Sequence, residues 1–285
     1  MKIGFYPGCS LEGVSREYYE SVVAVCRAFE IEPVEVPDWN CCGSTAAHNL
    51  NKELSLALPT TILAQAEKAE MREIVVPCAA CYSRLSVTKH ELTENPQLAS
   101  KIIERINLEY KGTIEILNIM QFIEKYISDK IASHIIRKFE YQAACYYGCL
   151  LVRPHKILGF DQLENPQSMD ILMKQLGATP VEWAYKTECC GAGFSLSRTD
   201  TVSRLSGKIL EDAVAHGADL IVVACPMCHS NLDMRRKNIN QWLGRDIQIP
   251  VLYITQVIGI AIGLSEKNLG LNRHVMPVIL NNQRN

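Results

Sequence analysis

Short apolar runs alternate along the chain with longer segments of helical periodicity. Tyr18, Val22, Val25 and Phe29 recur at helical spacing and predict an amphipathic helix over residues 15–29. In the first half, the pattern predicts strands at residues 2–7, 33–36, 73–77 and 113–119. It predicts further helices at residues 52–69, from 78 onward, across 93–111 and up to 126.

The second half repeats this order of elements. Its predicted strands lie at residues 141–146, 180–184, 220–224 and 249–254, and its predicted helices at 168–176 and 200–216. Alternating strands and helices favour parallel sheets built from right-handed crossovers. We therefore predict an α/β fold of two domains, residues 1–134 and 135–285, related by pseudo-twofold symmetry. Each would be a small, mainly parallel sheet flanked by helices, and residues 128–140 would connect them.

Three cysteine motifs occur in the same order in both halves: a Gly-Cys step, an adjacent pair in Cys-Cys-Gly, and a Cys-x-x-Cys. The copies are Gly8-Cys9, Cys41-Cys42-Gly43 and Cys78 to Cys81, and then Gly148-Cys149, Cys189-Cys190-Gly191 and Cys225 to Cys228. The adjacent pair and the Cys-x-x-Cys are separated by 35 residues in the first copy and 34 in the second. Such agreement indicates an internal repeat with a chemical purpose. Every motif follows a predicted strand, where α/β folds build their sites.

Composition narrows the range of functions. The 285-residue chain can bury a substantial core, and its net charge of −2 gives no basic surface for nucleic acid. The apolar run at residues 251–264 is too short to span a bilayer. We expect it to be a buried strand running into a helix; the alternative is a helix face docked on a partner subunit. The N-terminal residues lack signal-peptide features, which favours a cytosolic protein. In that compartment twelve cysteines indicate metal or redox chemistry more than structural disulfides.

Two of the twelve cysteines stand outside the repeated motifs. Cys26 lies on the apolar face of the first predicted helix and Cys145 lies within a predicted strand, so we expect both in the core. Buried thiols alone explain the ten cysteines in register poorly. A c-type haem would use Cys225, Cys228 and His229 but would leave the adjacent pairs without a role.

Three kinds of chemistry remain open for the ten repeated cysteines. Two Cys-x-x-Cys units could hold zinc, at least in one half. A thioredoxin-like dithiol needs a Cys-x-x-Cys where a strand leads into a helix, but it uses only four of these thiols. Iron–sulfur clusters use thiolates in number, and five in each half exceed the four of an ordinary cubane. The excess suggests an unusual cluster bridged by an adjacent cysteine, and Gly43 and Gly191 would let the backbone approach it closely.

The doubled order of motifs resembles the CCG-domain pattern, and nearly the whole chain resembles the B subunit of heterodisulfide reductase. The likeness includes the closing segment at residues 250–256. It implies that each half holds a noncubane 4Fe-4S cluster and that the two clusters face a shared substrate cleft. The implied ligands are Cys9, Cys41, Cys42, Cys78 and Cys81 in the first half, and Cys149, Cys189, Cys190, Cys225 and Cys228 in the second.

The implied reaction is reductive cleavage of a disulfide of the coenzyme M–coenzyme B type. Breaking a disulfide takes two electrons and each cluster supplies one, so each cluster could reduce and capture one sulfur. The resemblance implies electrons from a ferredoxin-like subunit that is fed in turn by a flavin subunit, since this chain has no flavin or nucleotide motif. Relatives with the same pattern serve other pathways, including sulfur oxidation. The alternative is therefore an electron-transfer subunit of another redox complex.

An anionic disulfide would need cations near the clusters. His48, Arg84, Arg198 and His229 lie within a turn or two of implied ligand cysteines and are the candidates for binding it. The alternatives are that both arginines are solvated helix residues and that His229 hydrogen-bonds a cluster sulfur or the backbone. Tyr82 takes the place of His229 in the first half.

Overall fold

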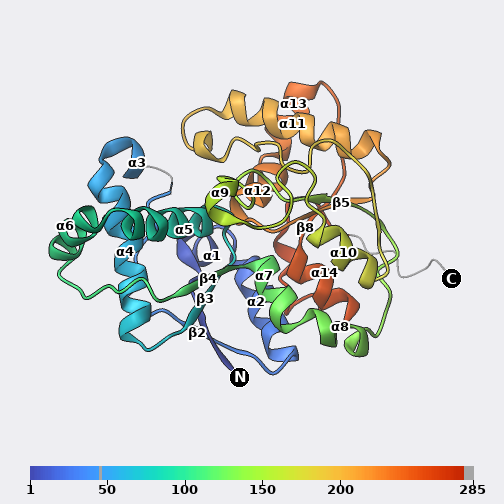
Figure 1. Ribbon diagram of the computed structural model, residues 1–285. Helices are drawn as coiled ribbons and strands as arrows, with labels where there is room; N and C mark the ends of the chain where they lie inside the picture. The colour runs from blue at the N-terminus through green and yellow to red at the C-terminus, as the bar shows by residue number, and fades with distance from the viewer. Residues whose placement is uncertain (45–46, 279–285) are drawn as a thin grey trace.

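The computed structural model describes residues 1–44 and 47–278 (Figure 1). Its first sheet has four parallel strands in the order β2-β1-β3-β4. The strands are β1 (Lys2–Phe5), β2 (Glu32–Glu35), β3 (Glu73–Val76) and β4 (Glu115–Asn118). Each lies within or next to a predicted strand segment. Short runs such as Ile74, Val75 and Val76 are fully buried, as is typical of the central strands of parallel sheets.

The second sheet repeats this arrangement, with four parallel strands in the order β6-β5-β7-β8. The strands are β5 (Gln142–Tyr146), β6 (Thr179–Pro180), β7 (Leu220–Val223) and β8 (Val251–Tyr253). β6 is shorter than the strand predicted at 180–184. Beyond Pro180, the Trp183 indole N–H donates to the Cys145 carbonyl (3.2 Å) and replaces a hydrogen bond of the ladder. The prediction of an α/β fold with two repeated domains is confirmed.

The helices of the first half connect its strands and lead into the second half. They are α1 (Gly8–Glu12), α2 (Arg16–Ala28), α3 (Ala47–Leu50), α4 (Lys52–Lys68), α5 (Ala79–Glu94), α6 (Pro96–Ile106), α7 (Ile119–Tyr126) and α8 (Ser128–His134). The helical stretch predicted at 93–111 is broken, because α5 ends at Glu94 and Pro96 begins α6. Proline is favoured in the first turn, where its missing N–H costs nothing. The connection predicted at 128–140 is partly helical, since α8 occupies its first part.

The helices of the second half include short 3-10 and π segments. They are α9 (His155–Leu158), α10 (Ser168–Gln175), η1 (Ala192–Phe194), α11 (Thr199–Ala215), α12 (Pro226–His229), the π-turn η2 (Ser230–Met234), α13 (Arg236–Leu243), α14 (Ile254–Ala261) and η3 (Leu271–Arg273). After its Cys-x-x-Cys, the first half continues as one regular helix, α5. The second half passes instead from α12 into the π-turn, a feature often found at functional sites.

The two halves share one continuous hydrophobic core. α2 from the first half packs on α14 from the second (Figure 1), and Tyr18 stacks on Tyr253 with ring centroids 3.9 Å apart. The Ser21 and Thr255 hydroxyls hydrogen-bond at 2.7 Å in the same contact. The prediction of a buried strand running into a helix near the C-terminus is confirmed, because β8 leads directly into the buried helix α14. The domain boundary between residues 134 and 135 stays a prediction.

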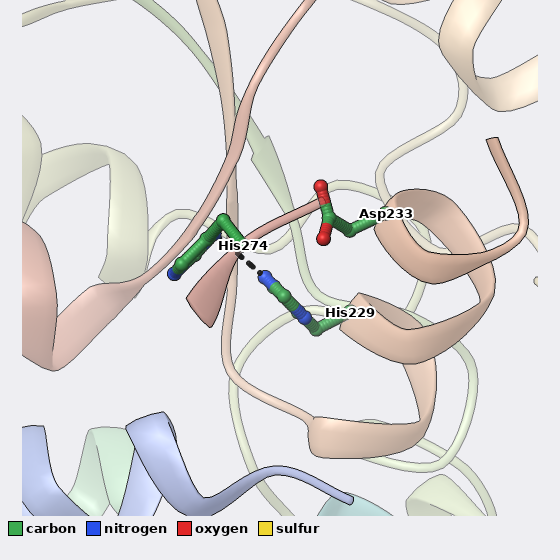
Figure 2. A group of neighbouring side chains, drawn as sticks. All are labelled: His229, Asp233 and His274. Atoms are coloured by element: carbon green, nitrogen blue, oxygen red, sulfur yellow. Dashed lines mark hydrogen bonds between the residues drawn. The ribbon is translucent and has the colours of Figure 1, made fainter. Parts of the chain in front are cut away.

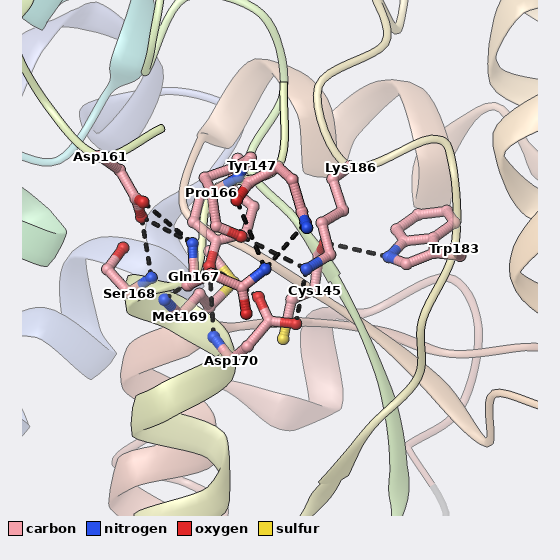
Figure 3. A network of polar contacts seen from close by, with 11 residues as sticks. Cys145, Tyr147, Asp161, Pro166, Gln167, Ser168, Met169, Asp170, Trp183 and Lys186 are labelled. Carbon is pink, nitrogen blue, oxygen red and sulfur yellow. Dashed lines mark hydrogen bonds and ion pairs between the residues drawn. The ribbon is translucent and has the colours of Figure 1, made fainter. Parts of the chain in front are cut away.

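A buried polar network holds the loop before the second adjacent cysteine pair (Figure 3). Lys186 Nζ lies 2.9 Å from Asp170 Oδ1, and both side chains are 2% exposed. The Tyr147 hydroxyl donates to Asp170 Oδ2 (2.7 Å), and its backbone N–H donates to the Lys186 carbonyl (2.9 Å). Pro7 stands at the equivalent place in the first half and carries neither a hydroxyl nor an N–H group. The network is therefore a specialisation of the second half.

Candidate metal centre

The repeated cysteines gather at the carboxyl ends of the strands. β1 and β5 lead into the two Gly-Cys steps, and β3 and β7 lead into Cys78 and Cys225, which directly precede α5 and α12. In a parallel sheet these strand ends all lie at one edge. The topology thus gathers the three motifs of each half, as the sequence predicts.

In the first half, two pairs of sulfurs are in contact. Cys9 Sγ lies 3.8 Å from Cys41 Sγ, and Cys42 Sγ lies 3.1 Å from Cys81 Sγ. Cys78 lies close enough to Cys81 to raise its pKa. Cys42, Cys78 and Cys81 are buried, whereas Cys9 and Cys41 are exposed, so the group has a buried side and a solvent side.

The second half has an equivalent group. Cys190 Sγ lies 3.6 Å from Cys228 Sγ. Cys149 lowers the pKa of its neighbour Cys189, and Cys228 lowers that of its neighbour Cys225. Cys190, Cys225 and Cys228 are buried, Cys149 is half-buried and Cys189 is exposed. The same positions of the repeat are therefore buried in both halves.

The two groups meet at the junction of the halves. Cys78 and Cys225 shift one another's pKa, so the first cysteines of the two Cys-x-x-Cys motifs are neighbours. The Tyr18 hydroxyl lies 3.5 Å from the Pro77 carbonyl and 3.3 Å from the Ala224 carbonyl, the residues that precede these cysteines. Tyr18 thereby helps to hold the two strand ends side by side. The ten thiols together form one array, which the spacing of the motifs does not predict.

Gly8 and Gly148 lie directly against the sulfurs. Both have positive φ, +66° and +69°, a conformation that favours glycine. A Cβ at Gly8 would lie 3.2 Å from Cys81 Sγ, and one at Gly148 would lie 3.0 Å from Cys228 Sγ. The glycine of each Gly-Cys step is thus required both by its backbone and by the neighbouring sulfur. Its repetition in the sequence was the available signal for this role.

The glycines after the adjacent pairs have positive φ. Gly43 and Gly191 have φ of +73° and +81°. A Cβ at Gly43 would lie 2.7 Å from Ala47 Cβ, and Gly191 faces α11 in the same way, so these glycines also allow the following helices to pack closely. Their N–H groups approach sulfur, at 3.5 Å for Cys41 and 3.3 Å for Cys189. That these glycines let the backbone approach a cluster stays a prediction.

Two equivalent tyrosines, which the sequence reasoning missed, brace the loops before the adjacent pairs. The Tyr6 hydroxyl donates to the Asn40 carbonyl (2.9 Å), and the Tyr146 hydroxyl donates to the Glu188 carbonyl (2.6 Å). Burial, followed by the nearby thiolates, raises the pKa of both hydroxyls, so both stay neutral donors. A tyrosine two residues before the glycine of each Gly-Cys step was the signal available in the sequence.

Interactions between neighbouring thiols lower the pKa of some cysteines and raise the pKa of others. Those with Cys41 and Cys81 lower the pKa of Cys42 well below its usual range. The hydrogen bond with Cys149 lowers the pKa of Cys189 to about 6. In Cys41 and Cys149 the same contacts raise the pKa. Each half therefore offers thiolate, the form that binds metals, at neutral pH.

Cys26 and Cys145 are core residues, as predicted. Their exposed fractions are 2% and 0%. Burial raises the pKa of Cys26 to about 12 and also raises the pKa of Cys145, so both remain neutral thiols.

The two arginine candidates lie in different surroundings. Arg84, on α5, is half-buried and lines a cavity beside the cysteine motifs of both halves. Arg198 is exposed and pairs with Asp200 at 3.3 Å, which agrees with the alternative of a solvated residue. His48 lies on α3, and its side chain is outside the described part of the structure.

The histidine candidate His229 is buried and contacts the backbone. Its Nε2 lies 3.2 Å from His274 Nδ1 (Figure 2). The same nitrogen lies 3.1 Å from the Val251 carbonyl, and the ring stacks on Tyr253. The alternative of a backbone hydrogen bond therefore describes it. Tyr82, its counterpart in the first half, is buried.

His229, Asp233 and His274 form a compact buried group, with donor atoms within 4.8 Å of one another (Figure 2). Hydrogen bonds already use these atoms. The Gln256 amide nitrogen lies 2.8 Å from His274 Nε2, and His274 Nδ1 lies 3.2 Å from His229 Nε2. Asp233 accepts the Val275 backbone N–H (2.8 Å) and that of the next residue (3.0 Å). These contacts fasten the C-terminal segment to the second half.

A cavity of about 360 Å³ opens beside the cysteine motifs of both halves. Equivalent positions of both halves line it. Ser44 and Ala192 follow the glycines of the adjacent-pair motifs, and Ala80 and Met227 lie inside the Cys-x-x-Cys motifs. Arg84 is the charged residue of the lining, which is otherwise uncharged over the described residues.

Comparison with known proteins agrees with this doubled arrangement. The family model "CCG: Cysteine-rich domain" matches residues 3–86 and 143–233. Each match contains all five repeated cysteines of its half. A solved structure of a hypothetical protein from Helicobacter pylori shares the fold, with a TM-score of 0.81 over 98% of this chain at 13% identity. The chain covers 52% of that protein's chain, so it spans about half its length.

Curated relatives match over nearly the full length. The B subunit of the "Ferredoxin:CoB-CoM heterodisulfide reductase" of Methanosarcina mazei is 28% identical, over 96% of this chain and 94% of its own. A Methanosarcina acetivorans protein, also named as the B subunit of a heterodisulfide reductase, is 29% identical over the same shares. The "8-methylmenaquinol:fumarate reductase membrane anchor subunit" of Wolinella succinogenes is 27% identical, over 96% of this chain and 97% of its own. The resemblance predicted from the motifs is confirmed. In residues 1–44 and 47–278, no helix is long and apolar enough to cross a membrane.

Proposed function

The chain belongs to the CCG cysteine-rich domain family, and from this premise we propose that it is the iron–sulfur subunit of a complex that reductively cleaves a disulfide. The relatives named as heterodisulfide reductase B subunits support this reaction. The observation that carries it is the pair of equivalent five-thiol groups, together with one cavity lined by residues from the cysteine motifs of both halves. A disulfide in that cavity would have one group on each side.

We propose that each five-cysteine set holds one noncubane 4Fe-4S cluster. The donors suit it, because they are sulfurs with buried and solvent-facing members and lowered pKa values at Cys42 and Cys189. A zinc ion, with bonds of about 2.3 Å to its thiolates, would draw three sulfurs close together. Among the described residues, the group of three possible metal ligands whose donor atoms lie within 4.8 Å of one another is His229, Asp233 and His274, and it contains no cysteine. This argues against the alternative of zinc in one half.

The chain's own residues would position and shield the reaction. When bound, the clusters would supply single electrons, of which disulfide cleavage needs two. Tyr6 and Tyr146 would hold the adjacent-pair loops in place through their carbonyl hydrogen bonds. The apolar cavity lining would exclude water around the disulfide, and Arg84 would attract an anionic substituent. Arg198 and His229 would have no direct part in binding, whereas His48, whose side chain lies outside the described part of the structure, stays a candidate.

The proposed electron donors are a ferredoxin-like subunit and, behind it, a flavin subunit of the same complex. Cys9, Cys41 and Cys189 lie on the solvent side of the array and would face the ferredoxin-like donor. A cytosolic location and a coenzyme M–coenzyme B type substrate complete the proposal.

The second candidate function is electron relay within another redox complex. The Wolinella succinogenes relative, named for a quinol and fumarate reaction, favours this interpretation. A single-turnover experiment separates the two. The full chain, purified without oxygen and chemically reduced, is mixed with coenzyme M–coenzyme B heterodisulfide, and the released thiols are counted. We expect about two thiols per chain, since cleaving one disulfide takes one electron from each of two clusters. A fully reduced sample that releases no thiol would make the chain a relay.

A further inference from the structure

The third residue after each Cys-x-x-Cys differs between the otherwise equivalent halves. It is Arg84 in the first half and Asn231 in the second. α5 runs through Arg84 as a regular helix, whereas the π-turn η2 begins at Ser230 and changes the direction of the side chain that follows. Asn231 is consequently fully buried, while Arg84 is half-buried at the cavity.

Asn231 brings a neutral amide to the second cysteine group. Its Nδ2 donates to the Cys190 carbonyl (3.0 Å) and lies 3.7 Å from Cys190 Sγ. The Ser195 hydroxyl donates to its Oδ1 (2.9 Å), so both ends of the amide are fixed. Arg235, a cation of this half, donates to the Ser195 carbonyl. The second group thus receives an N–H dipole from this position.

Arg84 brings a net charge to the first cysteine group. It forms no ion pair with a carboxylate in the described part of the chain. Arg84 follows Cys81 by three residues on the regular helix α5, and it lines the cavity together with Ser44, which follows Cys42 and Gly43 in the chain. The same position therefore favours negative charge on the group more strongly in the first half than in the second.

On the basis of the proposed function, we propose that Arg84 makes the two metal groups unequal, so that the first-half group has the higher reduction potential and receives the first electron. Reduction adds one negative charge, and a nearby net positive charge stabilises it more than an amide dipole does. One electron from the ferredoxin-like donor would go to the first half and the next to the second. Both would then pass to the disulfide, whose two sulfurs leave as thiolates and take up two protons.

The test is a redox titration, followed by electron paramagnetic resonance, of the full chain purified without oxygen. The wild type should show two one-electron transitions. Arg84→Asn, which places the second-half residue type in the first half, should shift the higher transition by at least tenfold in equilibrium constant, about 59 mV for one electron. The lower transition should stay in place. Arg84→Lys keeps the charge, so its higher transition should stay close to the wild-type potential. Arg198→Gln is the control and should move neither transition.

The variant Cys190→Ser, which disrupts the second-half group in the proposal, shows which half each transition belongs to. The transition sensitive to Arg84→Asn should persist there, since it belongs to the first half. The inference is overturned if Arg84→Asn moves neither transition, or if the sensitive transition is lost with Cys190→Ser. These outcomes leave two transitions in the wild type, so the proposed function survives them. A wild-type chain that binds no iron would instead overturn the proposed function.

Discussion

The two halves share a strand order and a cysteine pattern, yet they differ in the residues just outside it. Both use the Gly-Cys glycine against a sulfur and a tyrosine bracing the adjacent-pair loop. They diverge at two equivalent positions of the repeat: Arg84 in the first half corresponds to Asn231 in the second, and Pro7 corresponds to Tyr147. The shared features are those that a five-thiol site needs. The divergent ones adjust each site separately, which would let two similar sites perform different parts of one reaction.

The largest effect should come from removing one adjacent cysteine in either half. Cys42→Ser should remove about half of the iron and Cys190→Ser the other half, because each five-thiol set holds its own four-iron cluster in the proposal. Iron analysis of both variants, with circular dichroism to confirm folding, measures this. Loss of all iron from either variant would mean that the array, joined by Cys78 and Cys225, works as one unit.

The next largest effect concerns the buried ion pair between Lys186 and Asp170 in the second half. Lys186→Met should lower the free energy of unfolding by about 3–5 kcal/mol, because it leaves the Asp170 carboxylate buried and unpaired. Urea unfolding measures the change. The matched control is the double variant Lys186→Met with Asp170→Leu, which removes both charges and should recover most of the loss. A single variant as stable as the wild type would contradict the role given to the pair.

A smaller effect should be equal in the two halves. Gly8→Ala and Gly148→Ala should each cost about 1–2 kcal/mol for the left-handed backbone, and both should weaken iron retention because the new Cβ meets a sulfur. Gly217→Ala is the control, since Gly217 has φ +77° and nothing within 4 Å of the added Cβ. It should cost stability but keep all the iron. Equal iron loss in all three variants would mean that the sulfur contact is unimportant.

The smallest effect concerns the contact between the halves and depends on pH. Burial raises the pKa of Glu17 above its ordinary value of 4.5, although the Tyr253 hydrogen bond partly offsets this. The folded chain keeps a proton that the unfolded chain has lost. The stability from Glu17 is therefore full below pH 4.5 and is lost as the pH rises through the folded pKa. Glu17→Gln should remove this loss and be more stable than the wild type at pH 7. Parallel stability curves from pH 4 to 8 would contradict it.

Local patterns predicted most of the fold and the composition of the site. Alternating apolar runs placed the strands, and parallel topology brought the cysteine motifs to the strand ends. The short strand β6 escaped prediction because a side chain, Trp183, completes its ladder. The π-turn at Ser230–Met234 escaped as well, since buried side-chain contacts select it.

Contacts between the halves lay beyond the reach of the sequence. The proximity of Cys78 to Cys225 depends on how α2 packs on α14. It also depends on the Tyr18 hydroxyl, which lies near the carbonyls of the two residues that precede these cysteines. No spacing within one half encodes it. The choice among His48, Arg84, Arg198 and His229 also required the fold, because sequence proximity to a cysteine does not give side-chain direction. Only the structure separates Arg84, at the cavity, from Arg198, in solvent.

The most direct test of two equivalent metal groups is to measure iron, acid-labile sulfide and zinc per chain in protein purified without oxygen. The account predicts about 8 iron with matching sulfide and no zinc, as two four-iron clusters require. About 4 iron with about 1 zinc, the content of one cluster and one four-thiolate zinc site, would contradict it and make one half structural.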